Sequence, residues 1–223
     1  PFIKVKGTNT APSYASVPRL QDALAFHKKG DLHQAEAIYI WLLSINPTNY
    51  EALHLLGVVA LEKGNNQDAL DLISLAIEIN PNDASYHSNK GLALKELDKF
   101  EDAVISFDKA ILLNPKFAEA YSNRGAALRR LHLLDAAIES CEKAITIKPR
   151  LVEAYSNIGL ALQEQKKLDT AVANFDKAIK LKPNYFQAYS NRGNALLELK
   201  QFDAAIASYD KAITLRPDFA EAY

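Results

Sequence analysis

The chain has 223 residues, and its 26 basic and 27 acidic side chains leave a formal net charge of −1. The two signs are interspersed, which disfavours a duplex nucleic acid or an anionic membrane surface as a partner. No apolar run approaches the roughly 18 residues of a membrane-spanning helix. A single cysteine excludes an internal disulfide and a cysteine-based zinc site. We expect a cytoplasmic protein that binds no cofactor, no nucleic acid and no membrane.

The two ends of the chain lack the features of a complete protein. Methionine is absent even from residue 1, and the last four residues begin a sequence pattern that is then broken off. We expect the chain to be a part of a longer polypeptide. Residues 1–15 contain Pro, Thr, Asn, Ser and Gly, and we expect an unstructured leader or a cloning remnant there.

From residue 16 onward the sequence repeats with a period of 34 residues. Glycines follow this spacing from Gly57 to Gly193, alanines follow it from Ala35 to Ala205, and so do six of the nine prolines: Pro47, Pro81, Pro115, Pro149, Pro183 and Pro217. A fixed period of this length indicates a stack of supersecondary units rather than one closed globule. The predicted units are 16–49, 50–83, 84–117, 118–151, 152–185 and 186–219, and residues 220–223 open a seventh.

Each unit is predicted to form two helices of about 14 residues, helix A and then helix B. The turn between them falls at positions 15 and 16 of the unit, where Gly30 and Gly64 stand in the first two units. Glycine at position 8 and alanine at position 20 allow helices A and B to approach closely. Proline at position 32 ends helix B. The first unit departs most from this pattern, as terminal repeats often do.

These recurring residues resemble the tetratricopeptide repeat over residues 16–219. The resemblance implies an all-α solenoid, a right-handed superhelix of six helix hairpins. It also implies a concave groove lined by positions 2, 5, 6, 9, 12 and 13 of helix A. In this family the groove binds protein or peptide ligands.

Four consecutive units place a Ser-Asn pair on this stripe of helix A. The serines at position 5 are Ser88, Ser122, Ser156 and Ser190, and the asparagines at position 6 are Asn89, Asn123, Asn157 and Asn191. Asparagine is a poor helix former, but its carboxamide can pair with the N–H and C=O groups of an extended peptide. We predict a peptide-binding ladder of these eight residues. The alternative is that the pairs are remnants of recent duplication without a binding role.

Other polar residues are interpreted as structural. Position 5 has no lysine, which argues against the clamp by which related repeats hold a carboxylate terminus. Lys90, Arg124 and Arg192 at position 7 are expected to pack between repeats rather than to reach the groove. Cys141 replaces an aromatic residue and is expected in the core. The five histidines are scattered and the glycines isolated, so we predict no catalytic constellation and no phosphate loop.

Two functions follow. The first is a scaffold that binds an extended peptide. The second is the substrate-recruiting arm of a larger enzyme, because the Asn-containing phrases and the segments 20–24 and 53–57 are similar to the repeat arrays that precede bacterial O-GlcNAc transferase-type glycosyltransferases. The last helix B, around residues 202–215, should have an uncovered apolar face. Weak self-association through this repeat is therefore expected.

Overall fold

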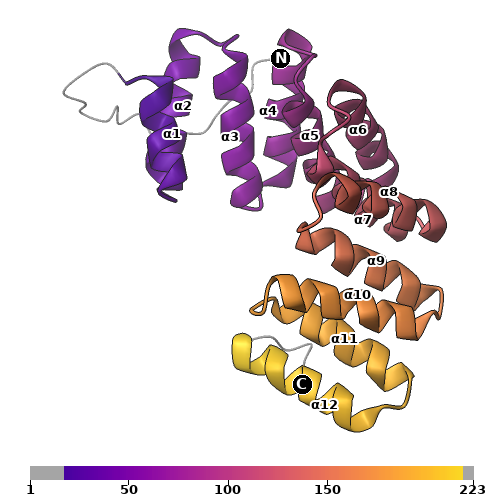
Figure 1. The fold of residues 1–223 in the computed structure, drawn as a ribbon. Coiled ribbons are helices and arrows are strands. Elements are labelled where there is room, and N and C mark those ends of the chain that lie inside the picture. The colour runs from indigo at the N-terminus through magenta and orange to yellow at the C-terminus, as the bar shows by residue number, and fades with distance from the viewer. Residues whose placement is uncertain (1–17, 218–223) are drawn as a thin grey trace. The chain divides into compact units, whose positions relative to one another are not determined.

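The structure is a computed structural model, and it describes residues 18–217. The expected unstructured leader, residues 1–15, and the start of a seventh repeat, residues 220–223, lie outside the described residues. The described part contains twelve α-helices and no β-strand (Figure 1). They are α1 (Leu20–Lys28), α2 (Leu32–Ile45), α3 (Tyr50–Glu62), α4 (Asn66–Ile79), α5 (Ala84–Glu96), α6 (Phe100–Leu113), α7 (Ala118–Arg130), α8 (Leu134–Ile147), α9 (Val152–Glu164), α10 (Leu168–Leu181), α11 (Phe186–Glu198) and α12 (Phe202–Leu215). The expected fold class, an all-α solenoid of six helix hairpins, is confirmed.

The chain divides into two compact units, Pro1–Ala93 and Leu94–Tyr223. Unit 1 holds α1 to α4 and most of α5, and unit 2 holds the end of α5 and α6 to α12. In unit 1, α3 packs against helix B of its own hairpin and against helix B of the preceding one, and α1 packs against α2. In unit 2, α7, α9 and α11 each pack against both of these B helices in the same way. In unit 2, α9 also contacts the neighbouring A helices α7 and α11. This nearest-neighbour packing is that of a repeat array.

The turn between helices A and B has the same backbone conformation in all six hairpins. Position 15 of each repeat has a positive φ, between 57° and 79°, at Gly30, Gly64, Asp98, His132, Lys166 and Lys200. The last four of these have a side chain, for which the left-handed conformation is unfavourable. Helix A ends at position 13 and the turn takes three residues. Helix A is therefore one residue shorter than the sequence analysis expected, except in the first repeat, where α1 begins only at Leu20.

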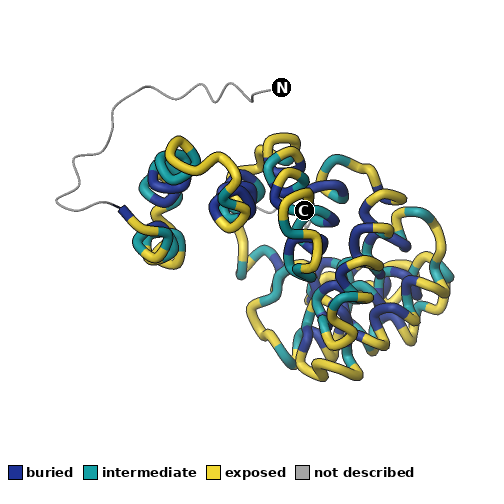
Figure 2. The backbone as a smooth tube through the Cα atoms, turned by 90° about the horizontal axis from the view of Figure 1, so that it is seen from above, coloured by how far each residue is buried: buried dark blue, intermediate teal, exposed yellow. Residues whose placement is uncertain are grey.

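Close contact between helices A and B fixes each hairpin. A Cβ atom added at Gly57 would lie 2.6 Å from Cγ1 of Ile73, and one at Gly159 would lie 2.5 Å from the ring of Phe175. At Gly125 it would overlap Sγ of Cys141. The residue at position 24 of helix B therefore fills the space that glycine at position 8 leaves open. Buried residues recur along every helix, whereas the turns are exposed (Figure 2).

Gly125→Leu should destabilise the protein by about 1–3 kcal/mol, because the added side chain overpacks the contact with Cys141. Urea unfolding followed by circular dichroism measures the change. Ala136→Leu is the matched control, since Ala136 is exposed on α8 and a surface substitution of this kind shifts stability by about 0.5 kcal/mol or less. Equal stability of the two variants would contradict the assigned packing.

Candidate functional site

The four serines of the predicted ladder are buried. Ser88, Ser122, Ser156 and Ser190 are between 2% and 4% exposed. The expectation that they face a ligand in the groove is therefore corrected. Position 5 lies where neighbouring helices pack, and these four repeats have a small side chain there.

The four asparagines at position 6 remain half-exposed. Asn89 lies in unit 1, and Asn123, Asn157 and Asn191 lie in unit 2. Two of them donate a hydrogen bond to position 5 of the preceding repeat. Nδ2 of Asn157 lies 3.2 Å from the backbone oxygen of Ser122 and 3.3 Å from its Oγ.

Asn89 makes the equivalent contact within unit 1. Its Nδ2 lies 2.9 Å from Nε2 of His54, which stands at position 5 of the second repeat. Because the amide nitrogen donates, the imidazole accepts and is neutral. For Asn123 and Asn191, no side-chain hydrogen bond occurs within residues 18–217. The chain itself therefore uses only part of the hydrogen-bonding capacity of the four carboxamides.

His54 is 8% exposed and stacks on the ring of Tyr86, with 4.1 Å between ring centroids. Burial lowers the pKa of His54 to about 4, and the nearby Asp83 carboxylate opposes this shift. Burial is also the main cause that raises the pKa of Tyr86 to about 12. The sequence analysis named His54 only as one of five scattered histidines. The structure places it in hydrogen-bond contact with Asn89, the first asparagine of the ladder.

A second row of contacts joins position 12 of one repeat to position 13 of the next. Nε2 of His27 lies 3.3 Å from Oε1 of Glu62 in unit 1. In unit 2, Nη1 of Arg129 lies 2.5 Å from Oε1 of Glu164. Nε2 of Gln163 lies 2.8 Å from Oε1 of Glu198, and hydrogen bonds from Lys166 and Gln163 lower the pKa of that carboxyl group. The row follows the stripe of helix A that was predicted to line the groove.

The described part of unit 2 has a hollow on this stripe, with a volume of about 310 Å³. Its lining includes Asn157, residues 95–96 at the end of α5, and Ala126, Arg129 and Arg130 of α7. Sequence reasoning missed this site. A comparison of position 13 would have revealed it, since that position is glutamate in four repeats and arginine only in the fourth.

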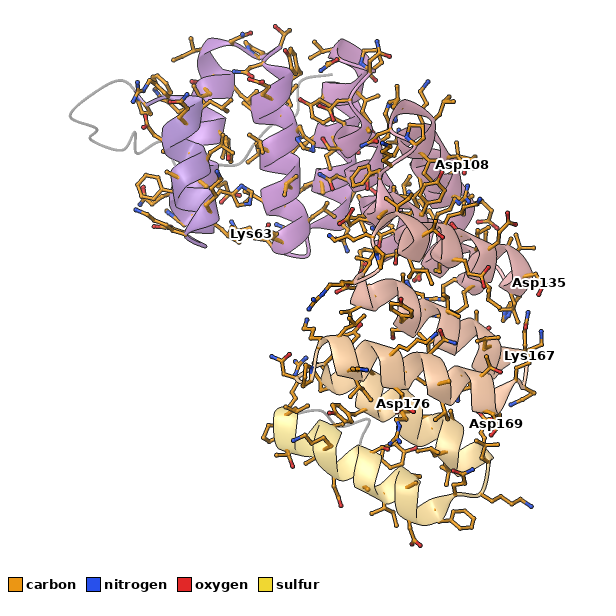
Figure 3. All side chains as sticks on the ribbon, viewed as in Figure 1. Lys63, Asp108, Asp135, Lys167, Asp169 and Asp176 are labelled. Atoms are coloured by element: carbon orange, nitrogen blue, oxygen red, sulfur yellow. The ribbon has the colours of Figure 1, made fainter. Side chains whose placement is uncertain are left out.

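The arginines at position 7 join repeats, as expected. Arg124 binds Ser140 of its own hairpin at 2.9 Å and Asp108 of the preceding one at 2.6 Å. Arg192 repeats this arrangement with Ser208 and Asp176. Figure 3 labels both aspartates, which stand on α6 and α10. These cations are therefore held between repeats by an acidic partner.

The remaining candidates also have structural surroundings. Cys141 is 1% exposed, and burial raises the pKa of its thiol to about 12, so its place in the core is confirmed. His87 is buried, and its Nε2 lies 2.8 Å from the backbone oxygen of Pro81. Within residues 18–217 no three His, Cys, Asp or Glu side chains gather as metal ligands. None of the described helices is long and apolar enough to cross a membrane.

The fold defines a helical repeat scaffold for protein interaction. Sequence profiles of the tetratricopeptide repeat match residues 118–151 and 186–219, and related profiles match 91–131, 164–200 and 26–92. The chain belongs to the tetratricopeptide repeat family. No curated protein sequence matches it significantly.

Solved structures of other proteins have similar folds. MamA is 31% identical over 72% of this chain and 94% of its own, with a TM-score of 0.64. YrrB, described as a TPR protein with an unusual peptide-binding site, is 20% identical over 82% of this chain and 95% of its own, with a TM-score of 0.59. PilF from Pseudomonas aeruginosa is 18% identical over 91% of this chain and 92% of its own, with a TM-score of 0.75. The last two show likeness of fold alone.

Stability should fall as the pH is lowered from about 6.5 to 4, the interval between the ordinary pKa of histidine and that of folded His54. In this interval the unfolded chain binds a proton that folded His54 does not, so acidification favours unfolding. The loss should be at most roughly 3 kcal/mol, since one pKa unit corresponds to about 1.4 kcal/mol.

Urea unfolding at several pH values measures this loss. His54→Ser places at position 5 the residue that the next four repeats have there, and it should flatten the profile over that interval. An equal slope in the variant and the unaltered protein would contradict the assignment to His54.

Proposed function

We propose that the chain binds an extended peptide through the half-exposed asparagines at position 6. The orientation of Asn157 is the observation that carries this proposal. Its Nδ2 donates hydrogen bonds to Ser122, and its Oδ1 accepts no hydrogen bond from the described residues. A backbone N–H group of a ligand is the complementary donor. Such a contact holds the backbone of a peptide without selecting its side chains.

The spacing of the repeats fits an extended ligand. Packed helices lie about 8–10 Å apart, so neighbouring A helices should offer one asparagine per roughly 10 Å. An extended chain advances about 3.3 Å per residue. Each asparagine of unit 2 would meet every third residue, and Asn123 to Asn191 would span about six residues. YrrB, with its peptide-binding site, is a structural precedent for this use of the fold.

The role as the recruiting arm of an O-GlcNAc transferase-type glycosyltransferase stays a second proposal. It needs the same groove, so the described residues do not separate the two roles. Sequence on either side of residues 1–223 decides between them, because a nucleotide-sugar-binding domain would establish the second. A cytoplasmic location likewise stays a prediction, and fractionation of the native host cells would test it.

Replacing Asn123 and Asn157 together by Ala should weaken peptide binding about 5- to 150-fold, since each lost hydrogen bond is worth about 0.5–1.5 kcal/mol. The probe is a peptide selected from a library of random 12-residue sequences, and fluorescence polarisation measures its affinity. Asn174→Ala is the control, because Asn174 stands on helix B of the fifth repeat and bonds only to its own helix. Unchanged affinity in the double variant would reject the ladder.

A control for stability belongs to the same experiment. Asn157→Ala also removes the hydrogen bonds to Ser122, whereas Asn123→Ala removes none that the described residues make. Circular dichroism of the single variants at the assay temperature separates loss of binding from loss of fold.

We further propose weak self-association through the sixth repeat. Phe202 on α12 is 57% exposed, whereas Phe100 at the same position of the third repeat is 9% exposed. Likewise Ile206 is 57% exposed and its equivalent Leu70 only 9%. Within the described residues, no following helix A covers this face of α12. An uncovered apolar face of this kind favours association.

Light scattering over a wide concentration range should show a rising mean mass. Ile206→Glu should abolish the rise, because it places a charge in the apolar contact. Ile105→Glu is the matched control, since Ile105 is 66% exposed on α6 and lies outside the sixth repeat. A constant monomer mass at high concentration would contradict self-association.

A further inference from the structure

The row of contacts between positions 12 and 13 is interrupted at one step of unit 2, where both residues are cations. At the steps from Arg129 to Glu164 and from Gln163 to Glu198, a donor at position 12 meets a glutamate of the next repeat. At the preceding step, position 12 is Lys95 and position 13 of the next repeat is Arg130. Two cations thus stand where the other steps have a donor and an acceptor.

The hollow on the groove lies at this step. Lys95, Arg129 and Arg130 contribute to its lining, and Asn157 of the ladder does so as well. Ala126 leaves the space open, since position 9 holds leucine in Leu92 of the preceding repeat and Leu160 of the following one. The fourth repeat therefore differs from its neighbours at the positions that make this hollow.

The cations are positioned by the protein but are not fully paired. The guanidinium group of Arg130 lies 4.3 Å from the ring centroid of Phe100, and its Nη2 lies 3.2 Å from Oδ1 of Asp98. The side chains of that ion pair are 51% and 75% exposed, so the pair is weak. Nε of Arg129 is buried and has no hydrogen-bond partner among the described residues.

Among the described residues, Lys95 has only a neighbouring acid as its partner. Its Nζ lies 3.0 Å from Oε1 of Glu96, the next residue of α5. Glu96 and Asp98 are both exposed at the edge of the hollow. Three cations and two carboxylates therefore line the hollow, and Glu164 pairs with Arg129 from outside the lining. Lys95 and Arg130, whose acidic partners are exposed, are left as the cations that a ligand carboxylate would bind.

We propose that this hollow binds the side-chain carboxylate of an aspartate or glutamate in the bound peptide. The inference rests on the proposed function, because the peptide would run past Asn157. The ligand carboxylate would accept hydrogen bonds from Lys95 and Arg130, as a glutamate at position 13 accepts one from position 12 at the next two steps. Arginine–carboxylate hydrogen bonds are short and charge-assisted. The ladder would hold the peptide backbone, and the hollow would select one acidic side chain.

Selection from a display library of random 12-residue peptides tests the inference. The peptides are fused to the display protein at their C-terminal end, so that only side chains and not a terminal carboxylate supply the anion. We expect the selected peptides to share an aspartate or glutamate at one position. Replacing that residue by Asn or Gln in the synthetic, C-terminally amidated peptide should weaken binding about 10-fold or more.

Two variants of the protein reproduce residues that its other repeats already have. Arg130→Glu restores the common residue of position 13, and Ala126→Leu fills the hollow. Both should abolish the preference for an acid, and affinity for the Gln or Asn peptide should change less than affinity for the acidic one. Lys143→Glu is the matched control, because it changes the net charge equally on the exposed face of α8.

The outcomes separate this inference from the proposed function. Selected peptides without a shared acid, or an acid preference that survives in both variants, would overturn the inference and leave the peptide-binding groove in place. Failure to select any peptide would overturn both. Binding of the synthetic peptide only after its C-terminal amide is replaced by a free carboxylate would also overturn the inference, because it assigns the hollow to a chain terminus.

Discussion

The close approach of helices A and B is the constraint on which the rest of the structure depends. Glycine at position 8 has no Cβ, and the side chain at position 24 of helix B occupies that space. Because the interior of a protein is densely packed, a larger residue would push the two helix axes apart. The contact also sets the rotation of helix A about its own axis. Positions 4, 8 and 11 are therefore directed to helix B, and positions 6, 9, 12 and 13 form the stripe for which peptide binding is proposed.

Packing between neighbouring repeats decides which polar residues of that stripe remain accessible. Position 5 lies against the next hairpin, so its serines are buried, and Ser122 accepts hydrogen bonds from Asn157. Position 6 lies one step around the helix and stays half-exposed. The hydrogen bonds from Asn157 to Ser122 and from Asn89 to His54 restrict the carboxamides to one orientation. A restricted side chain loses less conformational entropy when it binds.

Departures from the repeat are more informative about specificity than the repeat itself. The regular residues supply glycine contacts, helix ends and the inter-repeat contacts of Arg124 and Arg192. The fourth repeat has a small residue at position 9 and two arginines at positions 12 and 13, and a hollow lies there. The net charge of −1 conceals this local excess of cations. A uniform array would bind a backbone, whereas an irregular one can also distinguish side chains.

The period of 34 residues, with its glycines and prolines, by itself determined the fold class, the number of hairpins and the helix-pair packing. These features depend on local propensity and on contacts between residues less than one repeat apart. Sequence also placed Cys141 in the core and the position 7 arginines between repeats, since size and register decide both. Burial of the serines, the low pKa of His54 and the hollow beside Ala126 depend on the neighbouring repeat. A linear pattern does not give the distance of closest approach between A helices, so only the tertiary structure decided these features.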